Sequence, residues 1–371
     1  MTSHHVSFVL DPSTLPSLHN VASVIRESGR DPTRITWLAL PRGTIRRIEG
    51  LEDLPSLEHL VLLDNLIERI EGLDRLASLE ELYLQGNRIG RIEGLEALSN
   101  LKYLDLSRNP ICKMEGLASC TSLRTLVLDG ACITRIEGLD ALNPISDMSL
   151  ANNFIASLEG LPVKEYHGSF DLSNNQITTI KELEPLEYVY EYVYLSRNRI
   201  ERIEGLDHVW IQHLTLDHNR IRTLEGLEGS SITRLDLQNN RIEDIAGLGS
   251  LDPGDEYCDP YAFDLSSNRI RDVKGVAGLV ALDILKLGYN QIKAIDWEEL
   301  SPSITWLVLS GNSIRSLKGI ERLDLSKLEV SGCPLDVHVQ KEIVAFNEQA
   351  SRMTDDAERV AWLKRIGDMA P

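Results

Sequence analysis

One pattern recurs about every 22 residues and limits the possible folds more than any other feature of this chain. The pattern is LxxLxLxxNxIxxIEGL, and residues 79–95 match it at every fixed position. Successive asparagine positions lie 22 residues apart six times from 43 to 175, and then 23, 21, 21, 28, 22, 22 and 21 residues apart. A fixed period of this length predicts a solenoid of stacked repeats. The asparagine position holds Asn65, Asn87, Asn109, Asn153, Asn175, Asn198, Asn219, Asn240, Asn268, Asn290 and Asn312, and three further copies hold Gly43, Ala131 and Cys333.

Each repeat begins with alternating apolar residues, as in Leu60-Val61-Leu62 and Leu235-Asp236-Leu237. A period of two places the leucines on one face of a short strand and the variable residues on the other face. One coil alone cannot bury its leucines, whereas coils stacked above and below bury them continuously. The chain is therefore expected to form about 14 coils, with parallel strands on the concave face and little helix on the convex face.

The asparagine and glycine that recur in each repeat have local roles. The short amide of asparagine suits the turn after the strand, where it can bond to the main chain of adjacent coils. The glycine of Glu-Gly-Leu supplies a backbone position without a Cβ constraint. A row of basic residues that includes Arg47 and Arg69 lies two places before a row of glutamates, so we expect ion pairs within or between coils.

The repeat with its Ile-Glu-Gly-Leu turn resembles the short-repeat subclass of leucine-rich-repeat proteins, typified by the leucine-rich-repeat regulatory subunit of protein phosphatase 1. Residues 35–333 carry the resemblance. It implies an α/β fold, a curved horseshoe with a parallel β-sheet on its concave face, short 3-10 or irregular segments on its convex face, and helical caps. It also implies a binding scaffold without catalytic activity, in a role like that of a phosphatase regulator. Bacterial internalins share a repeat of similar length and are the alternative resemblance.

Both ends of the solenoid need a cap over the exposed core. We predict an N-terminal cap with a short helix over residues 1–34, the solenoid over 35–333, and a C-terminal helical cap over 334–371. The first C-terminal helix carries Val337 to Phe346, and the second begins at Asp355, with Glu358 three residues later as in a capping box. These helices either cap the solenoid or also bind a partner.

Composition limits the partners and the compartment. The net charge of −19 argues against nucleic acid and against an anionic membrane surface. No apolar run is long enough to span a membrane, and the first ten residues lack the basic start of a signal peptide. Five cysteines without CxxC spacing fit reduced thiols. We therefore expect a cytoplasmic protein that is monomeric by itself. A cleaved N-terminus or surface anchoring would instead favour an internalin-like adhesin.

The third and fifth positions of each repeat face the concave side. They combine exposed aromatic residues with carboxylates, as protein interfaces do. We therefore predict a binding surface for a folded protein that presents a basic patch. A structural subunit of a larger assembly is a further alternative. The predicted partner-binding residues are Trp37, Glu81, Tyr83, Tyr103, Asp105, Asp147, Asp171, Tyr192, Tyr194, His213, Asp236 and Trp306.

Catalytic and metal-binding patterns are missing from the sequence. It contains no GxSxG, HExxH or GxxxxGK[ST] motif. The longest interval between repeats holds an acidic insertion at 249–260, but its spacing lacks the terminal glutamate of an EF-hand, so a solvated loop is expected there. We expect no enzyme activity, no cofactor and no metal site.

Overall fold

The computed structural model describes residues 7–9, 25–142, 145–161, 168–183, 190–252, 260–350, 352–353 and 355–369. The chain divides into two compact units, Met1–Ile177 and Thr178–Pro371. The predicted division into cap, solenoid and cap at residues 34 and 333 is a different partition and stays a prediction.

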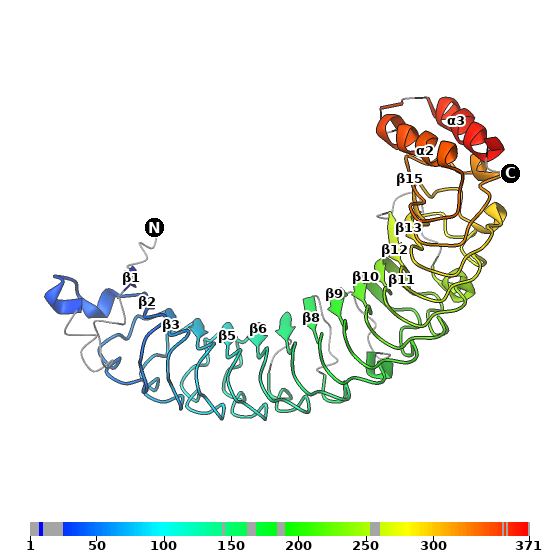
Figure 1. Cartoon of the computed structure of the whole chain (residues 1–371). Helices are drawn as coiled ribbons and strands as arrows, with labels where there is room; N and C mark the ends of the chain where they lie inside the picture. Colours follow the sequence, from blue (N-terminus) through cyan, green and yellow to red (C-terminus); the bar gives the residue numbers. More distant parts are fainter. Residues whose placement is uncertain are drawn as a thin grey trace. The chain divides into compact units, whose positions relative to one another are not determined.

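Unit 1 is built from short parallel strands in chain order, each pairing with the next. The strands follow one another along the same side of the coils (Figure 1). They are β1 (Ser7–Val9), β2 (Trp37–Ala39), β3 (His59–Val61), β4 (Glu81–Tyr83), β5 (Tyr103–Asp105), β6 (Thr125–Val127), β7 (Asp147–Ser149) and β8 (Gly168–Asp171).

Unit 2 repeats this arrangement and adds two helices after its last strand. Its strands are β9 (Tyr190–Tyr194), β10 (Trp210–Thr215), β11 (Ser231–Asp236), β12 (Tyr261–Asp264), β13 (Leu282–Lys286), β14 (Trp306–Val308) and β15 (Lys327–Glu329). The helices are α2 (Val337–Ala350) and α3 (Asp356–Met369).

Between the strands, the described part of the coils forms short 3-10 segments, as the sequence predicts. They are η3 (Pro32–Arg34), η4 (Lys181–Leu183), η5 (Ala246–Ser250), η6 (Trp297–Glu299) and η7 (Ile320–Arg322). Two parts of the predicted architecture cannot be followed along their whole length. Most of the expected N-terminal helix lies outside the described residues, and its described part is helical at 25–27. Residues 253–259 of the acidic insertion also lie outside the described residues.

The predicted asparagine ladder is confirmed. Asn87 is 7% exposed; its Oδ1 accepts a hydrogen bond from the Ile67 N–H at 3.0 Å. Its Nδ2 donates to the carbonyls of Leu62 at 3.0 Å and Leu84 at 2.9 Å. The side chain therefore joins two coils and closes its own turn. Asn219 makes the same set of bonds in unit 2.

The residue before each of these asparagines adopts a left-handed backbone conformation. Arg108 has φ 54° and Tyr289 has φ 56°, although neither is a residue type that favours this region. Gly94, in the Glu-Gly-Leu turn, has φ 69°, and a Cβ there would lie 2.3 Å from the carbonyl oxygen of Ile70 in the preceding coil. Glycine is needed here because the two coils approach too closely for any side chain.

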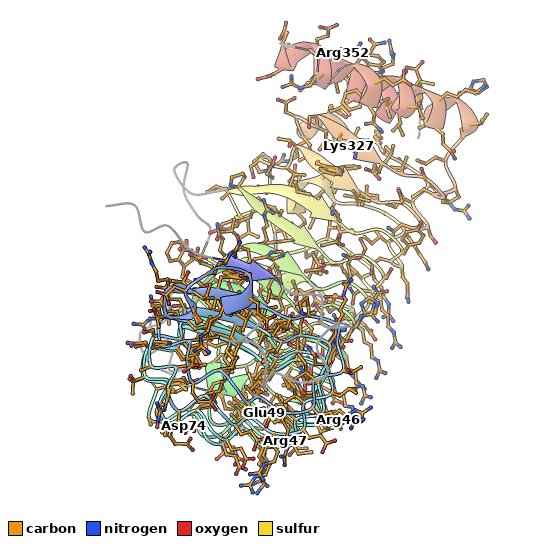
Figure 2. All side chains as sticks on the ribbon, turned by 90° about the vertical axis from the view of Figure 1, so that its left-hand side faces the viewer. Arg46, Arg47, Glu49, Asp74, Lys327 and Arg352 are labelled. Carbon is orange, nitrogen blue, oxygen red and sulfur yellow. The ribbon has the colours of Figure 1, made fainter. Side chains whose placement is uncertain are left out.

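The basic and acidic rows on the edge opposite the strands pair between neighbouring coils. Arg69 Nε lies 2.9 Å from Glu93 Oε1, and Arg91 Nε lies 3.0 Å from Glu115 Oε1. Figure 2 shows the start of these rows on the side of unit 1 away from its strands, where Arg47 is labelled. Because both arginines are about 70% exposed, each pair contributes only about 0–1 kcal/mol.

Candidate functional site: the strand face

The surface formed by the third and fifth side chains of each repeat is called the strand face below. In β3 and β4 the central leucine is buried, and the residues on either side of it are half-buried. Register places Glu81 beside Tyr103 and Tyr83 beside Asp105. The predicted assignment of third and fifth positions to one exposed face is therefore confirmed for these strands.

Aromatic rings gather at the start of the strand face of unit 1. Tyr83 and Tyr103 have ring centroids 4.8 Å apart, and Trp37 lies 4.7 Å from the ring of His59. Glu81 links the two pairs. Its Oε2 accepts a hydrogen bond from the Tyr83 hydroxyl at 2.9 Å and lies 2.9 Å from His59 Nδ1. Burial and the hydrogen bond to Glu81 raise the pKa of Tyr83, so its hydroxyl stays a proton donor at neutral pH.

The carboxylates of unit 1 differ in how accessible they are. Asp105 is buried, and its Oδ1 accepts hydrogen bonds from Ser107 N at 2.9 Å and Ser107 Oγ at 2.6 Å. Asp171 accepts from Ser173 N in the same way at 2.9 Å. Asp147, by contrast, is exposed on β7. Asp105 and Asp171 therefore close the turns after their strands.

Asp129 joins this acidic group, although it lies outside the third and fifth positions. Its Oδ1 accepts from Ser149 Oγ at 2.6 Å and from the Ala151 N–H at 2.9 Å in the next coil. Burial is the largest influence on its pKa and raises it, and the nearby charges of Asp171 and Asp105 raise it further. Sequence reasoning missed Asp129 because it considered only the strand positions, whereas Asp129 follows the strand by two residues.

The strand face of unit 2 begins with three rings in mutual contact. The rings of Tyr192 and Tyr194 stack with centroids 6.1 Å apart, and His213 meets both edge-on, at 6.0 Å from Tyr192 and 5.9 Å from Tyr194. Burial lowers the pKa of His213, and the positive charge of Arg234 lowers it further. His213 is therefore neutral at physiological pH and behaves as a third ring of an aromatic cluster.

A hollow of about 520 Å³ opens next to this cluster. It arises at Ala262, where a small side chain lies between the larger Arg234 and Ile284 on the neighbouring strands. Asp236 contributes to its wall, and Gln238 N donates to Asp236 Oδ1 at 3.0 Å. Trp306, on β14, also lines the hollow.

Two lysines lie close to the Trp306 ring. Lys327 Nζ lies 3.8 Å from the centroid of its ring, and Lys286 Nζ lies 5.6 Å away. Lys286 also pairs with Asp264 at 3.3 Å. Lys327 is labelled on β15 in Figure 2. The strand face of unit 2 therefore carries both positive and negative charges, whereas the sequence predicted an acidic and aromatic surface along the whole face.

The comparisons with known proteins agree with this architecture. Residues 33–89 match the family model described as "Leucine rich repeat", and residues 77–119 match "Leucine Rich repeats (2 copies)". The structure is similar to an internalin, InlF, from Listeria monocytogenes, with a TM-score of 0.60 and 22% identity over 87% of this chain and 94% of that one. It is also similar to a leucine-rich-repeat protein of Leptospira interrogans, with a TM-score of 0.61 and 21% identity over 85% and 89% of the two chains.

This chain is a leucine-rich-repeat protein. The predicted fold class, a parallel leucine-rich-repeat solenoid with C-terminal helices, is confirmed. A further similar structure is the LRIM1/APL1C complex, with a TM-score of 0.63 and 17% identity over 80% of this chain and 57% of that one. No curated protein matches the sequence. At these identities the solved structures establish the fold alone.

Within the ranges that the structure describes, no three His, Cys, Asp or Glu side chains are grouped so that they could hold a metal ion. No helix in the described part of the chain has the length and apolar character to cross a membrane. The chemistry that the strand face offers is aromatic contact and charge.

Proposed function

We propose that this leucine-rich-repeat protein is a non-catalytic, cytoplasmic scaffold that binds a folded protein on its strand face. The observation that carries the proposal is the group of Tyr83, Tyr103 and Glu81, in which two rings 4.8 Å apart lie on an exposed sheet surface beside a carboxylate. Leucine-rich repeats commonly serve as interaction scaffolds, and aromatic anchors beside charged groups supply much of the energy of protein interfaces. The resemblance to the phosphatase regulatory subunit extends the proposal to a regulatory-subunit role.

The charge of unit 1 defines the partner surface that fits it. None of the third and fifth positions from Trp37 to Asp171 carries lysine or arginine, whereas Glu81, Asp105, Asp147 and Asp171 are acidic. A partner that docks there presents a basic patch. Since exposed charges are screened over about 8–10 Å at physiological ionic strength, association is expected to slow as salt is added.

Unit 2 fits a different surface. Its strand face combines the Tyr192, Tyr194 and His213 cluster with the cations Arg234 and Lys286. A partner segment with aromatic or apolar side chains and at least one acidic group suits this composition. The strand face of each unit therefore fits a partner surface of different charge.

Photo-crosslinking tests the proposal. Tyr103→p-benzoylphenylalanine and Trp306→p-benzoylphenylalanine place a photoreactive group on the strand face of each unit, and the matched control Arg69→p-benzoylphenylalanine places it on the opposite edge. We expect the same protein to be crosslinked in cells from positions 103 and 306, and we expect no crosslink to it from position 69. Crosslinks to a protein from position 69 alone would overturn the proposal.

The alternative function is a surface adhesin, which the structural similarity to an internalin favours. Cell fractionation with protease treatment of intact cells separates the two functions. A scaffold of the cytoplasm stays protected and co-fractionates with cytosolic proteins, whereas an adhesin is cleaved from the outside.

A further inference from the structure

Two cysteines of unit 1, Cys112 and Cys132, lie side by side on adjacent coils. The Cys132 N–H donates to the carbonyl of Ile111 at 2.8 Å. This bond places the backbone of Cys132 next to the peptide that joins Ile111 to Cys112.

Burial raises the pKa of the Cys132 thiol, and the nearby Cys112 thiol raises it further. Cys112 Sγ donates to the carbonyl of Pro110 at 3.8 Å. Adjacent parallel segments are about 4.8 Å apart, which lies within the Cα separation of about 4.4–6.8 Å that disulfides require. Both residues are free thiols; Cys112 is exposed and Cys132 is half-buried, so a small reagent reaches the pair from solvent.

This pair lies at the one internal interruption of the asparagine ladder within unit 1. Ala131, directly before Cys132, occupies the asparagine position. In the flanking copies, Ile89 N donates to Asn109 Oδ1 at 2.9 Å and Ile133 N donates to Asn153 Oδ1 at 3.0 Å. Ile111 has no such amide to bond, and its N–H turns to the carbonyl of Asn109 at 2.8 Å. The junction between these coils therefore lacks the side-chain bonds that hold its neighbours.

We infer that Cys112 and Cys132 form a reversible disulfide that fastens these two coils, with a low-molecular-weight disulfide of the glutathione type as oxidant. The Cys112 thiolate attacks one sulfur of the oxidant, which forms a mixed disulfide and releases one thiolate. The Cys132 thiolate then attacks the Cys112 sulfur and releases the second. The protein loses two protons and two electrons, and the oxidant leaves as two thiols.

The other described cysteines differ from this pair. Cys120 is fully buried, so a reagent in solvent does not reach its thiol. Cys333 is buried as well, and its thiol donates to the carbonyl of Leu309 at 3.2 Å in place of the missing asparagine amide. Among the described cysteines, the chemistry is thus confined to the pair at the ladder interruption.

The test uses the purified full-length chain, equilibrated in buffers with increasing ratios of oxidised to reduced glutathione and then alkylated. Peptide mapping by mass spectrometry is expected to find a Cys112–Cys132 crosslink that dithiothreitol reverses. Cys112→Ser and Cys132→Ser should each abolish the crosslink and leave the remaining partner as a glutathione mixed disulfide. The matched control Cys120→Ala should keep the crosslink.

A second measurement tests whether the disulfide holds the two coils together. Amide hydrogen exchange of residues 110–134 should slow severalfold on oxidation of the wild-type chain, and it should not change in Cys112→Ser. The inference is overturned if Cys112 and Cys132 are oxidised only to separate mixed disulfides, or if the crosslink forms and exchange in this segment does not slow.

Discussion

The side-chain amide of Asn347 forms both of its backbone hydrogen bonds with a single residue, Leu328. The Leu328 N–H donates to Asn347 Oδ1 at 2.9 Å, and Asn347 Nδ2 donates to the Leu328 carbonyl at 2.7 Å. Asn347 lies on α2, whereas Leu328 is the central residue of β15, the last strand of unit 2. Asn347 thus makes the hydrogen bonds to Leu328 that a further strand would make. In this way α2 covers an edge that would otherwise be open to pairing with another chain. This arrangement supports a capping role for α2.

Asn347→Ala is therefore expected to destabilise unit 2 and to expose the edge of β15. The loss of two hydrogen bonds to partly buried groups should cost about 1–3 kcal/mol of unfolding free energy. Concentration-dependent self-association should appear in sedimentation experiments. Glu348→Ala, at the exposed neighbouring position, is the control and should change neither property. A monomeric Asn347→Ala with an unchanged denaturation midpoint would contradict the capping role.

A pair of reciprocal substitutions tests the asparagine ladder. Asn87→Ala removes one acceptor and two donors that join neighbouring coils, so the unfolding free energy should fall by about 1–3 kcal/mol. Ala131→Asn introduces the same amide where Ile111 N–H lacks it, and it should raise the unfolding free energy by about 1 kcal/mol. Chemical denaturation measures both, and hydrogen exchange should show the gain near Ile111. Equal midpoints for the wild type and Asn87→Ala would refute the role of the ladder.

The regular part of this fold can be predicted from the sequence because every coil uses the same residues at the same positions. The asparagine position and the leucine alternation recur at fixed spacing, and they place Asn87, Tyr103 and Trp306 correctly in the turn or on the strand face. The helix at 356–369 was also predictable, since Asp355 Oδ1 accepts from the Ala357 N–H at 2.9 Å as a capping residue does. Strand β1 was not predicted, because Ser7–Val9 carries no repeat pattern; in the structure it pairs with β2 in parallel.

The details of the site depend on contacts that a periodic pattern does not contain. The sequence places Asp105 on the strand face, but its burial follows from the hydrogen bonds to Ser107. Likewise, the two residues Cys112 and Cys132 occupy different positions of the repeat, and their proximity is seen only from the hydrogen bond between the Cys132 N–H and the Ile111 carbonyl. His59 was assigned no role, yet its ring packs against Trp37 and lies beside Glu81. The burial and contacts of these side chains depend on how neighbouring side chains pack.

The raised pKa of Asp129 predicts how stability depends on pH. A carboxyl whose folded-state pKa lies above its unfolded value of about 3.8 contributes stability while it is protonated. That contribution is complete below the unfolded pKa and is lost as pH rises through the folded pKa, so ionised Asp129 destabilises the fold at neutral pH. Asp129→Asn keeps an acceptor for Ser149 and Ala151 and should raise the denaturation midpoint at pH 7.

The gain from Asp129→Asn should shrink as pH falls and should vanish below about pH 3.8, where both the wild type and the variant are neutral at this position. Denaturant titrations at a series of pH values measure it. Asp147→Asn, at an exposed position of the same strand face, serves as the control. A gain for Asp129→Asn that does not vary with pH would mean that charge is not its cause.

The strand face is tested most directly by removing its rings one at a time. In Tyr103→Ala, Tyr192→Ala and Trp306→Ala the truncated side chain lies on the exposed side of its strand, so folding should change little. At least one of the three should weaken binding of the crosslinked partner by about 2 kcal/mol or more, which corresponds to a roughly thirtyfold higher Kd. Calorimetry or surface plasmon resonance measures the change, and circular dichroism checks the fold. Arg69→Glu, on the opposite edge, reverses a charge that pairs with Glu93 and should leave the Kd within about twofold, the range expected for a residue outside the interface. Loss of binding in Arg69→Glu together with unchanged binding in all three ring variants would place the interface on the other side of the coils.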